Sequence, residues 1–250
     1  STKSVYISAS PVVINEVAWN GTSGHTEDEW IELYNRSPYD VDLSGLTLYS
    51  KTDMSPYIKL SGTVASGGYY LIERKNDGET DEATQSPVKN IVADLWASFG
   101  LGLNNLGENL VLAVAPSGTS GQATSTMDEI SYCLNWCGAN SSYSSERYNP
   151  NQPGTSSSNW ASNYSLVING KSVTGASIIG TPKARNSLNY LVNKNAGISS
   201  DLTLKKNNSP YIVDDTILQI ASGKTLTIEP GVVIKFNKAA KISAIGNIVA

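Results

Sequence analysis

The sequence contains one histidine, His25, and this scarcity excludes several kinds of chemistry. A site built on two histidines, such as a His-Glu-x-x-His zinc motif, cannot form, and a Ser-His-Asp or Cys-His arrangement would have one residue available as its base. The sequence also lacks a Gly-x-x-x-x-Gly-Lys-Ser/Thr phosphate loop and a Gly-x-Gly-x-x-Gly motif at the start of a helix. No apolar run reaches the roughly 18 residues that a membrane-spanning helix needs. Catalysis is therefore poorly provided for, and a binding or structural role gains weight.

Charge is also sparse, at 16% of 250 residues, against roughly 25% in an average soluble domain. The 18 Lys and Arg against 22 Asp and Glu leave a net charge of −4. This charge is too weak and of the wrong sign for electrostatic binding, so we expect no nucleic-acid partner and no anionic membrane surface. Thirteen tyrosines and many Ser and Asn residues take the place of charge, a composition that favours an extracellular β protein.

The two cysteines lie in Cys133-Leu-Asn-Trp-Cys137. A disulfide that closes this short loop fits an oxidising, extracytoplasmic compartment. The alternatives are two free thiols, or a zinc site that would need two more ligands than the local sequence offers. A redox Cys-x-x-Cys motif has two intervening residues, whereas this loop has three. We favour a Cys133–Cys137 disulfide and a location outside the cell or at its surface.

Short β-type runs separated by Gly, Pro, Asn and Ser dominate the chain, and helical periodicity is almost absent. Strands are predicted at 12–19, 29–35, 46–50, 69–73, 109–114 and 129–132. This many short strands predict an all-β sandwich over residues 11–189. A further strand forms an N-terminal arm at 1–10. The Ser-, Asn- and Tyr-rich insertion near 133–177 is too polar for a core and is expected to wrap the surface.

The pattern changes in the last fifth of the chain. Apolar runs at 217–220, 225–228, 232–236 and 242–249 follow one another closely, with tight turns between them. These strands are too short and too closely spaced for a second sandwich, so they predict a β-solenoid. We place a linker at 190–202 and an incomplete solenoid segment at 203–250.

Several motifs of the first unit, taken in order, resemble the lamin tail domain in its bacterial form. Val13-Ile-Asn-Glu-Val17 and Asp28-Glu-Trp-Ile-Glu-Leu-Tyr-Asn35 are similar to the first two strands of that family. Leu103-Asn-Asn-Leu-Gly-Glu-Asn-Leu-Val-Leu112 is similar to a later strand, and Gly180-Thr-Pro-Lys-Ala-Arg-Asn-Ser187 to the closing segment. The resemblance implies an immunoglobulin-like β-sandwich that serves interaction and attachment, and it brings no catalytic residues.

The second unit contains Ser222-Gly-Lys-Thr-Leu-Thr-Ile-Glu-Pro-Gly-Val-Val-Ile-Lys-Phe236, which resembles the start of a right-handed parallel β-helix of bacterial surface proteins. Two or so coils cannot close their own core, since roughly three or more repeats and a cap are required. We therefore expect Ile242, Ile245 and Ile248 to form an uncovered surface with free strand edges. Either the polypeptide continues past residue 250, or another subunit stacks head to tail and builds a filament.

Two pairs of residues are candidates for chemistry or binding. Glu16 and Glu32 lie on neighbouring predicted strands and could act as acid and base, but a cross-strand polar pair or surface contacts are favoured. Trp19 and Trp30 could form an exposed platform for a sugar. Packing in the core is the favoured alternative, with Trp30 kept as a candidate binding residue.

Loops and the N-terminal arm supply the remaining candidates. The carboxylates Asp77, Glu79 and Asp81 could hold calcium, the only cofactor considered, but their spacing departs from the EF-hand pattern and a solvated acidic loop is the favoured interpretation. His25 is expected to be an exposed loop residue. Val5 and Ile7 could pair with the sheet of a neighbouring molecule.

These observations favour a non-catalytic extracellular structural or attachment protein. It would be a cell-surface or filament subunit that assembles with itself or with other surface proteins through strand and solenoid edges. The alternative is a surface-displayed binding module for polysaccharide or protein. A third reading is the front part of a larger carbohydrate-active β-helix enzyme, whose active site would lie beyond residue 250.

Overall fold

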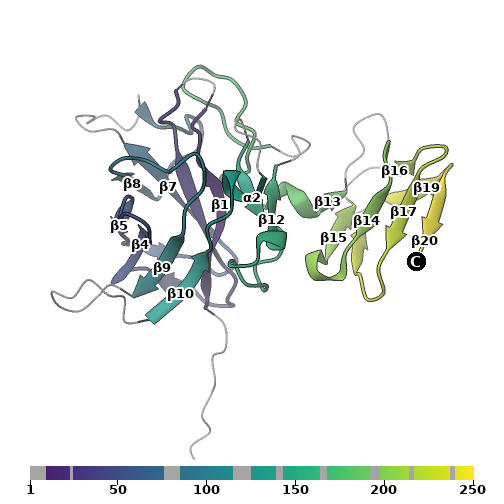
Figure 1. Cartoon of the computed structure of the whole chain (residues 1–250), viewed down its shortest axis with the longest axis horizontal. Helices are drawn as coiled ribbons and strands as arrows, with labels where there is room; N and C mark the ends of the chain where they lie inside the picture. Colours follow the sequence, from purple (N-terminus) through teal and green to yellow (C-terminus); the bar gives the residue numbers. More distant parts are fainter. Residues whose placement is uncertain are drawn as a thin grey trace, which may run out of the picture.

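The computed structural model contains two regions of β structure that follow one another along the chain (Figure 1). It describes residues 10–22, 25–75, 85–114, 125–138, 143–163, 168–191, 198–213, 217–236 and 240–250. The first region is a β-sandwich, the second is a β-solenoid, and helical structure is limited to single turns. The predicted all-β class and both architectures are therefore confirmed.

One layer of the sandwich is a six-stranded sheet in the order β12-β11-β1-β2-β7-β8. Its strands are β1 (Val12–Ala18), β2 (Trp30–Asn35), β7 (Tyr69–Lys75), β8 (Leu95–Ser98), β11 (Ser145–Arg147) and β12 (Trp160–Ser162). Neighbours are antiparallel except β7 and β8, which are parallel. All seven residues of β1 are buried, because both faces of this sheet are covered.

The other layer is a four-stranded antiparallel sheet in the order β10-β9-β4-β5. Its strands are β4 (Leu46–Ser50), β5 (Tyr57–Lys59), β9 (Leu110–Val114) and β10 (Ser125–Ile130). The short strands β3 (Val41–Asp42) and β6 (Thr63–Val64) pair beside it. Alternate side chains of the two sheets, such as Ile14, Leu33, Leu48 and Leu112, meet in the main core. The burial of these apolar side chains is the principal stabilising term of the sandwich.

The prediction that the insertion near 133–177 wraps the surface is wrong where this segment joins the sandwich. The segment supplies β11, β12 and two short turns, α2 (Asn135–Gly138) and η1 (Ser157–Asn159), to the sandwich. β11 pairs directly with β1, and Trp136 and Trp160 join the main core. The polar residues of β11, which suggested a surface segment, are buried and hydrogen-bonded. Ser145, Glu146 and Arg147 are each at most 2% exposed. Composition alone cannot reveal such pairing.

The solenoid begins earlier than predicted, so the expected linker at 190–202 is incorrect. Within its described part, β13 (Tyr190–Leu191) follows the turn η2 (Ser187–Asn189) and pairs with β15 (Tyr211–Val213). The remaining elements are β14 (Leu202–Leu204), η3 (Lys206–Asn208), β16 (Ile217–Ile220), β17 (Thr225–Ile228), β18 (Ile234–Phe236), β19 (Lys241–Ala244) and β20 (Asn247–Val249). They form three parallel sheets, β13-β15-β18, β14-β17-β20 and β16-β19.

Aligned apolar side chains fill the solenoid core. Leu204, Val213, Ile220 and Leu226 are at most 1% exposed and pack in one cluster. Leu202 pairs with Leu226, which pairs in turn with Ile248. The three side chains, one from each coil, therefore stack in a column. The parallel stacking is thus established, whereas the right-handed winding remains a prediction.

Candidate functional site

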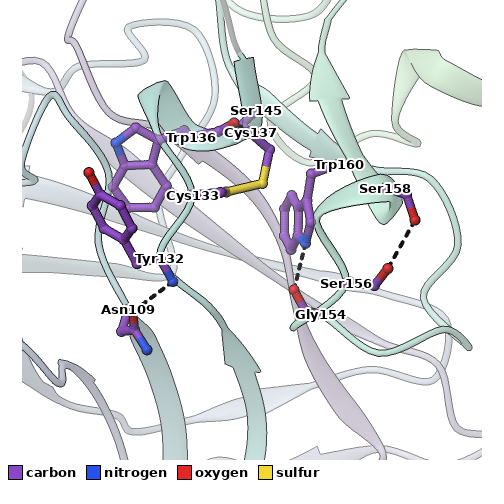
Figure 2. Close-up of a disulfide and its surroundings, with 10 residues drawn as sticks. All are labelled: Asn109, Tyr132, Cys133, Trp136, Cys137, Ser145, Gly154, Ser156, Ser158 and Trp160. Atoms are coloured by element: carbon purple, nitrogen blue, oxygen red, sulfur yellow. Dashed lines mark hydrogen bonds between the residues drawn. A yellow bond between two sulfur atoms is a disulfide. The ribbon is translucent and has the colours of Figure 1, made fainter.

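A disulfide joins Cys133 and Cys137, as predicted, with their Cα atoms 4.9 Å apart (Figure 2). The loop that it closes contains three consecutive residues in the left-handed region, Asn135, Trp136 and Cys137, with φ of 49°, 50° and 65°. This conformation costs roughly 1–2 kcal/mol per residue outside glycine. The sequence therefore forms a tight left-handed turn here that other contacts must stabilise.

Two tryptophans hold this turn and its surroundings in the core. Trp136 is 2% exposed, and its indole Nε1–H donates to the Asn104 carbonyl oxygen at 2.9 Å. Trp160 Nε1–H donates to the Gly154 carbonyl oxygen at 2.8 Å (Figure 2). Ser145, on β11, donates its hydroxyl to the Trp136 carbonyl oxygen at 3.1 Å. The disulfide turn thus has a structural role, fixing the chain where it passes from β10 to β11.

A row of buried carboxyl groups crosses the outer face of the six-stranded sheet. In the strand register, Glu16 of β1 lies opposite Glu32 of β2 on one side and Glu146 of β11 on the other. All three side chains are completely buried. The sequence favoured a cross-strand polar pair or surface contacts for Glu16 and Glu32. The register confirms the pair, whereas surface contacts are wrong because both side chains are buried. Sequence reasoning missed Glu146, because the polar insertion gave no sign of a strand there.

Residues 180–189, the closing segment, cover this row and bind it through backbone and hydroxyl groups. Glu32 accepts hydrogen bonds from the Lys183 N–H at 2.6 Å and from Asn15 Nδ2 at 2.9 Å. Glu146 Oε2 accepts from the Ser187 N–H and hydroxyl, both at 2.7 Å. A Cβ at Gly180 would lie 2.8 Å from the Trp30 ring. Only glycine lets the backbone approach the sheet this closely.

Thr181 links two of the carboxyl groups. Its N–H donates to Glu16 Oε1 at 2.8 Å, and its hydroxyl oxygen lies 2.8 Å from Glu16 Oε2 and 3.1 Å from Glu146 Oε1. One hydroxyl has one proton and cannot donate to both carboxylates at once. A protonated Glu16 resolves the conflict, since it can donate to the Thr181 oxygen while Thr181 donates to Glu146.

The electrostatics of the row favour protonation. Burial, followed by the neighbouring Glu146 carboxyl, raises the pKa of Glu16 from 4.5 to about 8. Burial also raises the pKa of Glu146 to about 7, although hydrogen bonds from Ser187 and Asn163 act in the opposite direction. Burial and the Glu16 carboxyl raise the pKa of Glu32 well above its usual value.

The row is suited to anchoring rather than to acid–base work on a substrate. Its side chains are covered, and their oxygen atoms are occupied by donors from the closing segment and neighbouring strands. A general acid or base needs to reach the proton of a bound substrate. The arrangement instead attaches the closing segment to the sheet.

The tryptophan platform that the sequence suggested does not exist. Trp30 is 0% exposed and packs on the outer face of the sheet with Leu71, Val88 and Ile178, and Trp19 is 4% exposed within the main core. The candidate role of Trp30 at a binding surface is therefore wrong. Val88 and Ile178, which lie outside the strands, and the backbone at Gly180 cover a face that sequence alone would leave open. His25 is exposed, as expected.

The calcium candidates Asp77, Glu79 and Asp81 lie outside the described residues, as do Val5 and Ile7 of the arm. In the part of the chain that the structure describes, no group of three or more His, Cys, Asp or Glu residues is arranged to hold a metal ion. Among the same residues, no helix has the length and apolar character to cross a membrane.

The last solenoid coil carries the predicted uncovered residues. Ile248 is 46% exposed and Ile245 is 66% exposed, with Val249 and Phe236 of the same coil also exposed. Ile242 is half-buried against the solenoid core. In the described residues, β18, β19 and β20 each pair with a strand of the preceding coil and with no strand beyond.

The sandwich and its covered carboxyl row define an immunoglobulin-like domain. The family model of the lamin tail domain matches residues 7–133 of this chain, about half its length, and the chain belongs to that family. No curated protein matches it. The match ends at Cys133, so β11, β12, the closing segment and the solenoid lie outside it.

Proposed function

We propose that this chain is a non-catalytic structural or attachment protein that works outside the cytoplasm, at a cell surface. In this proposal the sandwich is the attachment unit, and the solenoid is a stalk whose exposed coil of β18, β19 and β20 docks on a neighbouring subunit. The disulfide and the low charge of the sequence support the location, because disulfides persist in oxidising compartments.

One observation carries the docking proposal: the side chain at the outer end of an aligned column in the solenoid core is exposed. Leu226 is 0% exposed because it lies between Leu202 and Ile248. Ile248, at the end of the same column, is 46% exposed. A further layer on this end would bury Ile248 as Leu226 is buried, and it would pair the free edge of β20.

The opposite end of the solenoid adjoins the sandwich. A groove of about 630 Å³ there is lined by Tyr148, Trp160 and Leu188 of the sandwich together with Leu191 and Ile198 of the first coil. A head-to-tail filament would need this end to receive a neighbour, and sandwich side chains lie beside it. We therefore favour the pairing of two last coils about a two-fold axis, a closed contact.

Sedimentation of the chain over a wide concentration range tests the proposal. We expect a concentration-dependent dimer that Ile248→Lys abolishes. Ile217→Lys is the matched control, because Ile217 is the same residue type with the same 46% exposure but lies on the side of the middle coil. A ladder of larger species would favour the filament instead, and a monomer at every concentration would contradict docking through this end.

A further inference from the structure

A cavity of about 300 Å³ opens on the sandwich beside the carboxyl row. Its walls come from segments far apart in sequence, including Tyr34 of β2, Tyr69 of β7, Tyr148 after β11, and Arg185 and Asn189 of the closing segment. The volume lies at the lower end of the range for small-molecule sites, about 300–1,000 Å³. No Asp or Glu lines it.

Two of its tyrosines form a paired aromatic surface. Tyr34 and Tyr69 lie opposite each other on neighbouring strands, with ring centroids 5.1 Å apart and ring planes inclined by 35°. Both are half-buried, so they are held by the sheet and still reach solvent. The negative face of an aromatic ring attracts polarised C–H groups, and a phenol hydroxyl can both donate and accept hydrogen bonds.

The polar part of the wall is rigid and rich in acceptors. Asn15 Nδ2 donates to Glu32 Oε1 at 2.9 Å and to Asn186 Oδ1 at 2.7 Å. Asn186 Nδ2 donates in turn to the Asn15 and Arg147 carbonyl oxygens, at 3.0 Å and 2.9 Å. These bonds occupy the amide donors and leave acceptor lone pairs. The carboxyl row thus orders the wall of the cavity.

Asn189 supplies an independent sign of a missing partner. It is 7% exposed, and its Nδ2 donates to the Tyr148 carbonyl oxygen at 2.6 Å. Its Oδ1 is buried and has no hydrogen-bond partner among the described residues. Buried polar atoms are nearly always paired, and the described residues supply no donor for this oxygen.

We propose that this cavity binds one unit of a saccharide. A sugar ring presents C–H groups that pack on Tyr34 and Tyr69. Its hydroxyls can donate to the acceptor-rich amide wall and can accept from the Arg185 guanidinium. An apolar ligand would leave the amide wall unpaired, and a cation would meet Arg185. The proposal is independent of solenoid docking, because none of these residues belongs to the last coil.

A panel of neutral and acidic oligosaccharides, screened against the whole chain and followed by calorimetry, tests this site. We expect at least one sugar to bind, and Tyr34→Ala and Tyr69→Ala each to weaken binding at least about tenfold, a loss typical of one well-packed aromatic contact. Tyr34→Phe should retain most of the binding because it keeps the ring. Tyr57→Ala is the matched control, since Tyr49 and Tyr57 form a similar ring pair, with centroids 6.3 Å apart, on the other sheet.

The melting temperature of each variant is measured to show that it folds. If Tyr34→Ala does not fold, Tyr69→Ala alone tests the site. The proposal is overturned if no saccharide of the panel binds at concentrations up to about 10 mM, about tenfold above the Kd of a weak millimolar site. It is equally overturned if folded Tyr34→Ala and Tyr69→Ala bind as well as the unaltered chain.

Discussion

The sandwich and the solenoid are stabilised by different kinds of contact. In the sandwich, partners come from distant parts of the chain: Glu16 pairs with Glu146 across the register, and buried polar side chains tie the closing segment down. In the solenoid, each strand pairs with the strand one coil away, and the core is a set of apolar columns. Polar bonds lie at the corners, as between the Thr225 N–H and Asp201 Oδ1 at 2.8 Å.

This difference shows where each region is sensitive. The sandwich depends on a few groups that serve several elements at once, so one altered group affects the whole layer. The solenoid depends on near-neighbour contacts that repeat, so its stability is approximately a sum over coils. Each of the changes below is expected to lower the stability of one region and to leave the other region unaffected.

The largest expected effect comes from pH. Because the folded pKa of Glu16 is about 8 and that of Glu146 about 7, the folded state holds protons that the unfolded state releases near pH 4.5. The stabilisation is therefore complete below about pH 4.5 and is lost as pH rises to about 8, by about 1.4 kcal/mol per pH unit for each proton. Glu29 and Glu108, with pKa values raised to about 7, act in the same direction.

Denaturant unfolding of the sandwich between pH 5 and pH 9 measures this loss. Glu16→Gln is the decisive variant, because its amide can donate to Thr181 as the protonated carboxyl does. We expect it to make the pH dependence shallower and to unfold less readily than the unaltered chain at pH 9. Asp40→Asn, at an exposed position away from these carboxyl groups, should leave the profile unchanged. A flat profile in the unaltered chain would show that the row does not titrate in this range.

Truncation of a core side chain in each region should come next in size. Trp30→Ala removes a completely buried ring and should destabilise the sandwich by about 3–5 kcal/mol, while Leu226→Ala should destabilise the solenoid by about 2–5 kcal/mol. Hydrogen exchange resolved by peptide reads the two regions separately. Faster exchange confined to the altered region is the expected result, whereas loss of protection in both would mean that they unfold as one unit.

The smallest of the three effects belongs to the disulfide. Replacing Cys133 and Cys137 together by Ala should cost about 2 kcal/mol through the entropy of a loop this short. The loss should be confined to the sandwich, with the solenoid peptides unchanged in hydrogen exchange. Reduction of the unaltered chain provides the control and should reproduce the double variant. An unaltered midpoint of denaturant unfolding would mean that the packing of Trp136 alone holds the left-handed turn.

The apolar runs predicted much of this fold because strands that pack on a core need apolar residues, which are visible in the sequence. The predicted strands at 12–19 and 29–35 correspond to β1 and β2, and the later runs correspond to β16 and β17. The prediction failed where burial rests on polar groups: β11 reads as a surface segment because its Ser, Glu and Arg residues are satisfied by distant partners. The covered position of Trp30 and the cavity between Tyr34 and Asn189 likewise depend on the path of the closing segment, which no local pattern records.

The register of the solenoid gives the molecule a measure of length. Leu202 to Leu226 is 24 residues and Leu226 to Ile248 is 22 residues, and each such interval raises the stack by one strand spacing, about 4.8 Å. Inserting or deleting one coil would therefore change the height of the solenoid by a fixed step, without altering the chemistry of the sandwich. The number of coils and the surface of the sandwich can thus vary independently of each other.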